Sequence, residues 1–100
     1  MKVSINSVHF KTDKKLDDFI VEKVEKLTGL YNGIIGSEVT LRVENSETPD
    51  NKIAEIRILI RGYDLFAKKQ STSFEEATDT AVEALRKQLT KHKDKLKKVS

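Results

Sequence analysis

The sequence predicts an α/β protein of the α+β type, a two-layer sandwich with the element order β-α-β-β-β-α. Two segments in the middle of the chain, residues 38–44 and 52–61, alternate apolar and polar side chains, as half-buried strands do. Two other segments, one before and one after these strands, repeat apolar residues at helical spacing. We therefore expect a four-stranded sheet with two helices on one face. A length of 100 residues fits a single domain over residues 1–100.

The first strand and the first helix occupy the N-terminal third. Apolar residues at every second position predict a strand over residues 2–10, with an irregularity near Ser7 where the alternation changes phase. Thr12 or Asp13 can cap the helix that follows. Apolar residues then recur at helical spacing up to Leu27, and two glycines end the helix and its exit turn.

The next three strands are separated by turns. Residues 38–44 alternate strictly, and the turn cluster 45–51 separates them from a strand over residues 52–61. A tight turn over residues 62–64 leads into a fourth strand, residues 65–70. These three strands should form an antiparallel meander, whereas the first strand joins through a helix and should be parallel to its neighbour. The predicted inward side chains are Val39, Leu41, Val43, Ala54, Ile56, Ile58 and Ile60.

The final helix is predicted over about residues 74–96. Ser73, with Glu76 three residues later, has the pattern of a capping box. His92 falls on the apolar stripe of this helix and is expected to pack there. The stripe consists of Phe74, Ala77, Ala81, Leu85, Leu89 and Leu96.

Charge is distributed unevenly along the chain. Residues 86–98 hold seven Lys or Arg and one acid, whereas the rest of the chain holds twelve Lys or Arg and fifteen acids. An acidic body with a basic helical end points to a polyanionic partner. Lys87, Lys91 and Lys95 follow one another at i,i+4, where like charges repel by about 0.2–0.5 kcal/mol per pair. A phosphate backbone explains this row better than helix stability does, and a solvated helix face is the structural alternative.

The predicted RNA-binding residues come from this helix and from the open face of the sheet. The helix contributes Arg86, Lys87, Lys91, Lys93, Lys95, Lys97 and Lys98. The sheet would display Arg42, Arg57 and Arg61, which either extend the RNA surface or solvate the sheet. The chain offers few aromatic residues for base stacking on this sheet, so binding through backbone charge and shape fits better.

Other classes of function are disfavoured by what the sequence lacks. Without cysteine there is no disulfide, thiol catalysis or cysteine-ligated metal. The two histidines have no carboxylate cluster at ligand spacing, and no nucleotide-binding or nucleophile motif is present. We therefore expect no metal, no cofactor and no enzymatic activity. No apolar run approaches the roughly 20 residues that cross a bilayer, and the N-terminus lacks a signal-peptide pattern, so a cytoplasmic protein without a membrane partner is expected.

The order of elements and the segment Gln88–Lys97, Q-L-T-K-H-K-D-K-L-K, resemble the short ribosome hibernation-promoting factors. These are relatives of ribosome-associated inhibitor A in the sigma-54 modulation protein family, and the resemblance extends over the whole chain. It implies a fold related to double-stranded-RNA-binding domains. It also implies binding to the rRNA of the small ribosomal subunit, across the mRNA channel and the A and P tRNA sites. There the protein would compete with mRNA and tRNA, block translation and preserve idle ribosomes in stationary phase or stress.

The resemblance also bears on single positions. The family's arginine on the last helix is replaced by Lys87, which keeps the charge but loses bidentate phosphate geometry. Where the family begins that helix with an acidic–aromatic pair such as Asp-Met-Tyr, this chain reads Ser73-Phe74-Glu75, so the role of that tyrosine does not carry over. Long relatives carry a further domain that dimerises ribosomes, so we expect ribosome dimers only with help from another factor. The family's basic positions correspond to Lys87, Lys91, Lys93 and Lys95.

Alternatives from other classes stay open. One is a general RNA-binding domain, or a protein adaptor whose open sheet edge recruits a partner. Another is a small enzyme of acylphosphatase size, although such folds usually finish on a strand and this chain finishes on a helix. Retention on heparin discriminates between them, because an RNA-binding protein should elute late and an acidic-bodied adaptor or enzyme early.

Overall fold

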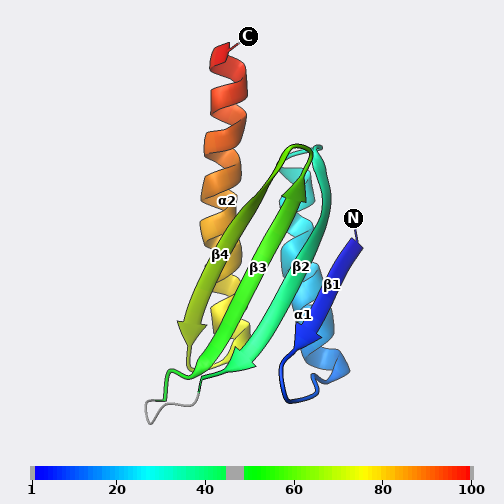
Figure 1. The fold of residues 1–100 in the computed structure, drawn as a ribbon, viewed down its shortest axis with the longest axis vertical. Coiled ribbons are helices and arrows are strands. Elements are labelled where there is room, and N and C mark those ends of the chain that lie inside the picture. The colour runs from blue at the N-terminus through cyan, green and yellow to red at the C-terminus, as the bar shows by residue number, and fades with distance from the viewer. Residues whose placement is uncertain (1, 45–48, 100) are drawn as a thin grey trace.

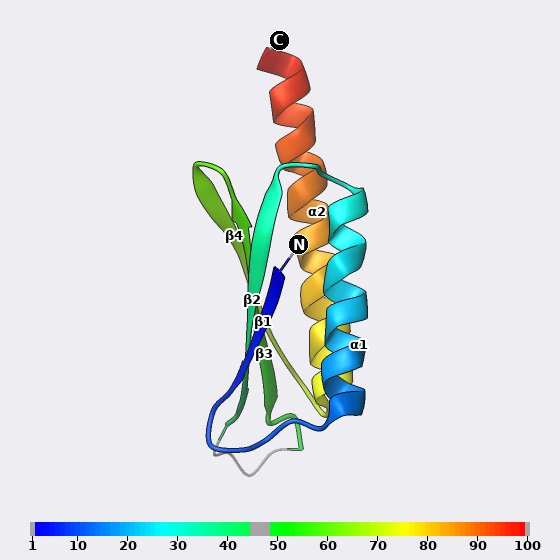
Figure 2. The same cartoon turned by 90° about the vertical axis from the view of Figure 1, so that its right-hand side faces the viewer.

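Two helices cover one face of a four-stranded sheet (Figures 1 and 2). The computed structural model describes residues 2–44 and 49–99, with their side chains except those of Tyr63 and residues 93–99. β1 is parallel to β2, and the other neighbouring strands are antiparallel. The predicted element order, layers and strand directions are confirmed. The elements are β1 (Lys2–Ser7), α1 (Lys14–Glu25), the 3-10 helix η1 (Lys26–Gly29), β2 (Ile34–Val43), β3 (Lys52–Ile60), β4 (Tyr63–Ser71) and α2 (Phe74–Val99).

The core lies between the inner face of the sheet and the helices. Helix α2 packs on β3 and β4, and α1 packs on α2 and β1. Strand alternation and helical spacing correctly indicated which side chains would be buried. Val43 is an exception, because it shares the phase of Leu41 but lies at the end of the β2–β3 ladder and is 47% exposed. Buried side chains include Val39, Leu41, Ala54, Ile56 and Ile58 from the strands and Ala77, Ala81, Leu85 and Leu89 from α2.

Strand β1 is shorter than predicted, because it ends at Ser7. The Ser7 hydroxyl donates a hydrogen bond to the Phe10 carbonyl at 2.5 Å, and His9 has a φ of 65°. A residue in this left-handed region turns the chain out of a strand. The turn brings Phe10 to Phe74 at the start of α2, where the two rings stack with centroids 5.0 Å apart. The irregularity near Ser7 is therefore the end of the strand.

Helix α1 begins after an aspartate cap. The Asp13 carboxylate accepts a hydrogen bond from the Leu16 N–H at 2.8 Å, so Asp13 rather than Thr12 is the N-cap. Replacing Asp13 by alanine should therefore lower the free energy of unfolding by about 1 kcal/mol, measured by urea denaturation. Thr12→Ala is the control and should cost less. Equal losses in the two variants would show that the cap contributes nothing specific.

Strand β2 begins at Ile34, four residues before the predicted start. The pairing with β3 shifts register between Ile34 and Gly36. A Cβ at Gly36 would lie 3.2 Å from the carbonyl oxygen of Lys2 in β1. Glycine thus permits the close approach of a neighbouring backbone. Because Lys2 is far away in sequence, local alternation did not reveal this extension of β2.

The turn between β3 and β4 is tighter than predicted. Ile60 pairs directly with Tyr63, so the loop consists of Arg61 and Gly62 alone. Gly62 has a φ of 101°, which glycine adopts without strain. Within the loop Gly62 alone has a positive φ, and this second loop position is where a type II turn requires glycine. Arg61 consequently lies at the tip of the hairpin and not on the outer face of the sheet, where the alternation placed it.

Helix α2 begins with half of the predicted capping box. The Ser73 hydroxyl accepts a hydrogen bond from the Glu76 N–H at 3.1 Å, while the Glu76 carboxylate accepts one from the Thr72 hydroxyl at 3.2 Å. The helix runs to Val99, three residues past its predicted end. Its C-terminal part extends beyond the end of the sheet (Figures 1 and 2).

Over the described ranges, 2–44 and 49–99, no helix has the length and apolar character needed to cross a membrane.

Candidate nucleic-acid interface

The second half of α2 presents cations on the side away from the core. Arg86, Lys87 and Lys91 are exposed, whereas Leu85 and Leu89 on the opposite side are fully buried. The three cations and Thr90 line an open groove of about 400 Å³. Lys87 and Lys91 are one helical turn apart, about 6 Å along the axis. The helical spacing therefore produces the exposed basic row that the sequence predicted for this part of α2.

Four further cations of the predicted site lie on the last turns of α2. Their backbone is helical up to Val99. Their side chains lie outside the described residues, so their assignment to the RNA surface stays a prediction. They are Lys93, Lys95, Lys97 and Lys98.

Arg86 is held by an acid on its own helix. Its Nε donates a hydrogen bond to Oε2 of Glu83 at 3.2 Å, and a terminal guanidinium nitrogen donates a second to the same carboxylate. Hydrogen bonding from Arg86 lowers the pKa of the Glu83 carboxyl, desolvation opposes this effect, and the charges of Arg86 and Lys87 lower the pKa further. The same pair raises the pKa of Arg86. Part of the Arg86 charge is thus already compensated, which leaves Lys87 and Lys91 as the stronger candidates for phosphate.

Two of the three predicted sheet arginines, Arg42 and Arg57, are paired with acids. On the outer face, Nε of Arg42 lies 2.7 Å from Oε2 of Glu55. Arg57 lies over the ring of Phe66, 5.4 Å from its centroid. Its guanidinium contacts two carboxylates, those of Asp64 at 3.2 Å and Glu38 at 3.9 Å. The open face therefore carries a network of mixed charge.

The structure separates the two halves of the predicted site. Arg42 and Arg57 lie on the outer face of the sheet, and α2 covers the inner face (Figure 2). Arg61 lies at the β3–β4 hairpin tip. One flat RNA surface cannot contact both faces of a sheet at once. The basic row on α2 is thus the coherent candidate, and a role of the three arginines in RNA binding stays a prediction.

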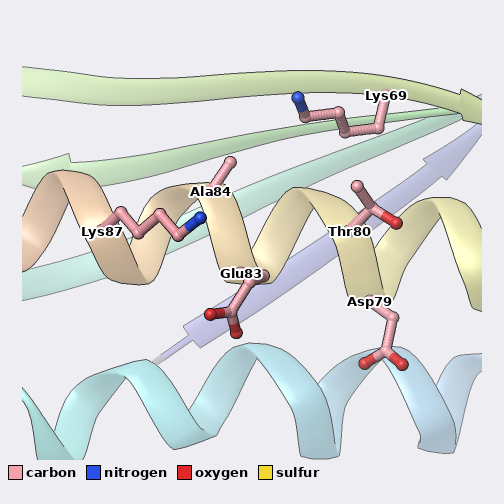
Figure 3. A pocket seen from close by; sticks show the side chains of 6 residues that line it. All are labelled: Lys69, Asp79, Thr80, Glu83, Ala84 and Lys87. Atoms are coloured by element: carbon pink, nitrogen blue, oxygen red, sulfur yellow. The ribbon is translucent and has the colours of Figure 1, made fainter.

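A second groove lies between α2 and the edge strand β4 (Figure 3). Its volume is about 610 Å³. Lys69 enters it from β4 and Lys87 from α2, with Ala84 between them in the view of Figure 3. Lys69 is not among the predicted RNA-binding residues. One sequence signal could have identified Lys69. It lies two residues after Ala67, so it is a lysine at a position where the strand would place an inward apolar side chain. The lining residues are Lys69, Asp79, Thr80, Glu83, Ala84 and Lys87.

The junction between α2 and the body is held by side chains of the same helix. His92 is half-buried, its Nε2 is 3.3 Å from the Tyr31 hydroxyl, and the two rings meet edge to face with centroids 5.1 Å apart. The Gln88 side chain donates a hydrogen bond to the Phe66 carbonyl of β4 at 3.1 Å. The prediction that His92 packs is confirmed.

Among the described side chains, no group of three or more potential ligands could hold a metal ion.

The sequence model of the sigma 54 modulation protein / S30EA ribosomal protein family matches residues 3–97. The chain belongs to this family. Its match to 95 of the 100 residues covers both the basic half of α2 and the sheet that carries it. The resemblance that the sequence suggested is confirmed.

Relatives in the S30EA family are similar to this chain over nearly their whole length. The ribosome hibernation promoting factor of Klebsiella oxytoca is 29% identical over 97 residues, which are 97% of this chain and 98% of that protein. The protein of the same name from Escherichia coli (strain K12) is 28% identical, with the same coverage. These names refer to the ribosome and not to a reaction, in agreement with the expectation that the protein is not an enzyme.

Two solved structures share the fold of this S30EA-family chain. The N-terminal domain of Protein Y from Thermus thermophilus superposes with a TM-score of 0.79 at 18% identity, covering 92% of this chain and 99% of that one. A ribosomal subunit interface protein from Coxiella burnetii gives a TM-score of 0.82 at 16% identity, covering 94% and 99%. Sequence identity this low shows the architecture alone.

Proposed function

We propose that this protein is a ribosome hibernation factor that binds the small ribosomal subunit through its rRNA. The observation that carries the proposal is the exposed row of Lys87 and Lys91, with Arg86 beside it, on a helix that extends past the sheet. The alignments of this chain with two relatives named ribosome hibernation promoting factor include 98% of the length of each relative. In this proposal residues 1–100 act as one binding domain, with a fold related to double-stranded-RNA-binding domains.

The mechanism we infer is occupancy. The lysines of α2 bind phosphates of rRNA, and the body fills the mRNA channel and the A and P tRNA sites, so mRNA and tRNA are excluded. No bond is made or broken, and no transition state has to be stabilised. Idle ribosomes in the cytoplasm are silenced and preserved in stationary phase or stress. Ribosome dimers, where they form, need another factor.

The attachment of α2 to the body supports this mechanism. Leu85 and Leu89 anchor the helix in the core, the Gln88 amide bonds to β4, and His92 packs on Tyr31. The basic row is therefore held in one orientation relative to the sheet. A rigid binding surface loses little conformational entropy on association, which favours affinity.

Co-sedimentation with separated small and large ribosomal subunits tests the proposal. We expect saturable binding to the small subunit, and initiator tRNA should compete with it. The logarithm of the affinity should fall by roughly 0.7–0.9 per neutralised phosphate for each tenfold rise in salt. Binding to neither subunit, or binding to the small subunit without competition from tRNA, would contradict the site.

A further inference from the structure

Lys69 occupies an unusual position in the sheet. In the β3–β4 register it pairs with Ala54, which is fully buried, so Lys69 belongs to the face that α2 covers. Its neighbours on the same face of β4, Ala67 and Ser71, are small and buried. Because β4 is an edge strand, a long side chain can leave this face sideways, with its stem on apolar surface and its ammonium group in solvent. Lys69 is accordingly only half-buried.

The Lys69 and Lys87 side chains enter the same groove from opposite sides (Figure 3). Lys69 comes from β4 and Lys87 from α2, and the small side chain of Ala84, which also lines the groove, lies between them in the view of Figure 3. Neither lysine forms an ion pair with another described side chain. Two ammonium groups at one open groove attract a single anion.

The acids of the groove are compensated by cations on its border. The Asp79 carboxylate lies 3.1 Å from Nζ of Lys23 on α1. The Glu83 carboxylate is bound by the guanidinium of Arg86. The charge of Lys87 also acts on Glu83, but both acids have their ion-pair partners elsewhere, so Lys69 and Lys87 are the two lining cations that can bind a ligand.

We propose that Lys69 and Lys87 together hold one phosphate group of an RNA backbone. The RNA track that begins on α2 at Lys91 and Lys87 then continues over Ala84 to the edge of β4. This inference rests on the proposed function, because it takes rRNA as the polyanion, and it adds a residue from a second element to the binding surface. With contacts on both α2 and β4, the RNA is oriented relative to the whole body and not only to one helix.

The position of Lys69 on an edge strand also fits a purely structural role. Inward-pointing charges on edge strands prevent two sheets from pairing edge to edge. That role predicts self-association when the charge is removed, and it predicts no change in RNA affinity. The phosphate role predicts the reverse.

The matched pair Lys69→Gln and Lys68→Gln separates these roles. The two lysines are adjacent on β4 and point to opposite faces of the sheet, so the two variants remove the same charge from different faces. We would measure affinity for purified small subunits and for a short RNA duplex over a salt series, and the oligomeric state by sedimentation. Lys69→Gln should weaken binding about fivefold and reduce the salt slope by about 0.7–0.9, while Lys68→Gln should match the wild type.

The outcomes distinguish this inference from the proposed function. If the wild type binds small subunits and both variants bind equally well, the Lys69 site is overturned and the function stands. Self-association of Lys69→Gln with unchanged RNA affinity would also overturn the site, in favour of edge protection. If the wild type does not bind small subunits, the proposed function fails, and the RNA duplex then decides the site. Weaker duplex binding by Lys69→Gln than by the wild type would support the site, and unchanged duplex binding would overturn it.

A double-mutant cycle tests whether the phosphate is shared. Lys69→Gln, Lys87→Gln and the double variant are compared for RNA affinity. Two lysines on one phosphate should be coupled, so the combined loss should differ from the product of the single losses by about twofold or more. Losses that simply multiply would mean that each lysine binds its own phosphate, which would overturn the shared site.

Discussion

Reversing the charge of both Lys87 and Lys91 should weaken binding to the small ribosomal subunit by about a thousandfold. Each change to glutamate removes one attraction to phosphate and adds one repulsion, and each of these is about 1 kcal/mol at 4 Å in water. The total of about 4 kcal/mol corresponds to about three orders of magnitude in affinity. Both side chains are exposed, so the fold should survive. Co-sedimentation over a salt series measures the loss, and circular dichroism checks the fold.

The double reversal of Lys14 and Lys15 is the matched control. These lysines are also exposed, and the change in net charge is the same. They lie in the first turn of α1, at the end of the helical layer opposite to the projecting part of α2 (Figure 2). Acids are favourable near a helix N-terminus, so stability should not suffer. Similar losses in the two double variants would mean that net charge, and not the basic row, drives binding.

Replacing Leu85 by alanine should lower the free energy of unfolding by about 2–5 kcal/mol. Leu85 is fully buried in the cluster where α2 meets the sheet, and truncation removes apolar contacts and leaves a cavity. A loss of this size is a large part of the roughly 5–15 kcal/mol that stabilises a typical domain. Urea denaturation followed by circular dichroism measures it. The variant tests whether α2 is part of the core or an appended arm.

Ile35→Ala is the control for this variant. Ile35 is apolar too, but its side chain is 62% exposed at the start of β2. Surface substitutions usually change stability by less than about 0.5 kcal/mol. Equal destabilisation by the two substitutions would contradict the assignment of Leu85 to the core. If Leu85→Ala proved as mild as a surface change, α2 would have to be bound loosely to the sheet.

The elements and their faces could be predicted because each depends on short-range pattern. The alternation around Ile56 and Ile58 indicates a strand with one buried face, and the spacing of Leu85 and Leu89 indicates a helix with one buried stripe. The aspartate before α1 is a local capping residue of the same kind. The basic row also follows from spacing alone, because side chains four apart on a helix share a face.

Positions that depend on a distant partner could not be predicted in this way. The start of β2 depends on the contact of Gly36 with the backbone of β1, and the end of β1 depends on the turn at His9 that brings Phe10 to α2. Whether a charged side chain is available to a ligand depends equally on its neighbours in space. Arg57 is predicted as an outward cation, but only the register with β2 and β4 shows the acids that pair with it.

The sequence by itself determined the order of the elements, the two-layer architecture and the concentration of positive charge on α2. These follow from periodicity and composition, which act between residues close together in the chain. Only the tertiary structure decided which cations can act together. It placed Arg42 and Arg57 on the face away from α2, and it brought Lys69 of the edge strand beside Lys87. The physical reason is that electrostatic attraction depends on distance in space, and strand pairing and helix packing set that distance.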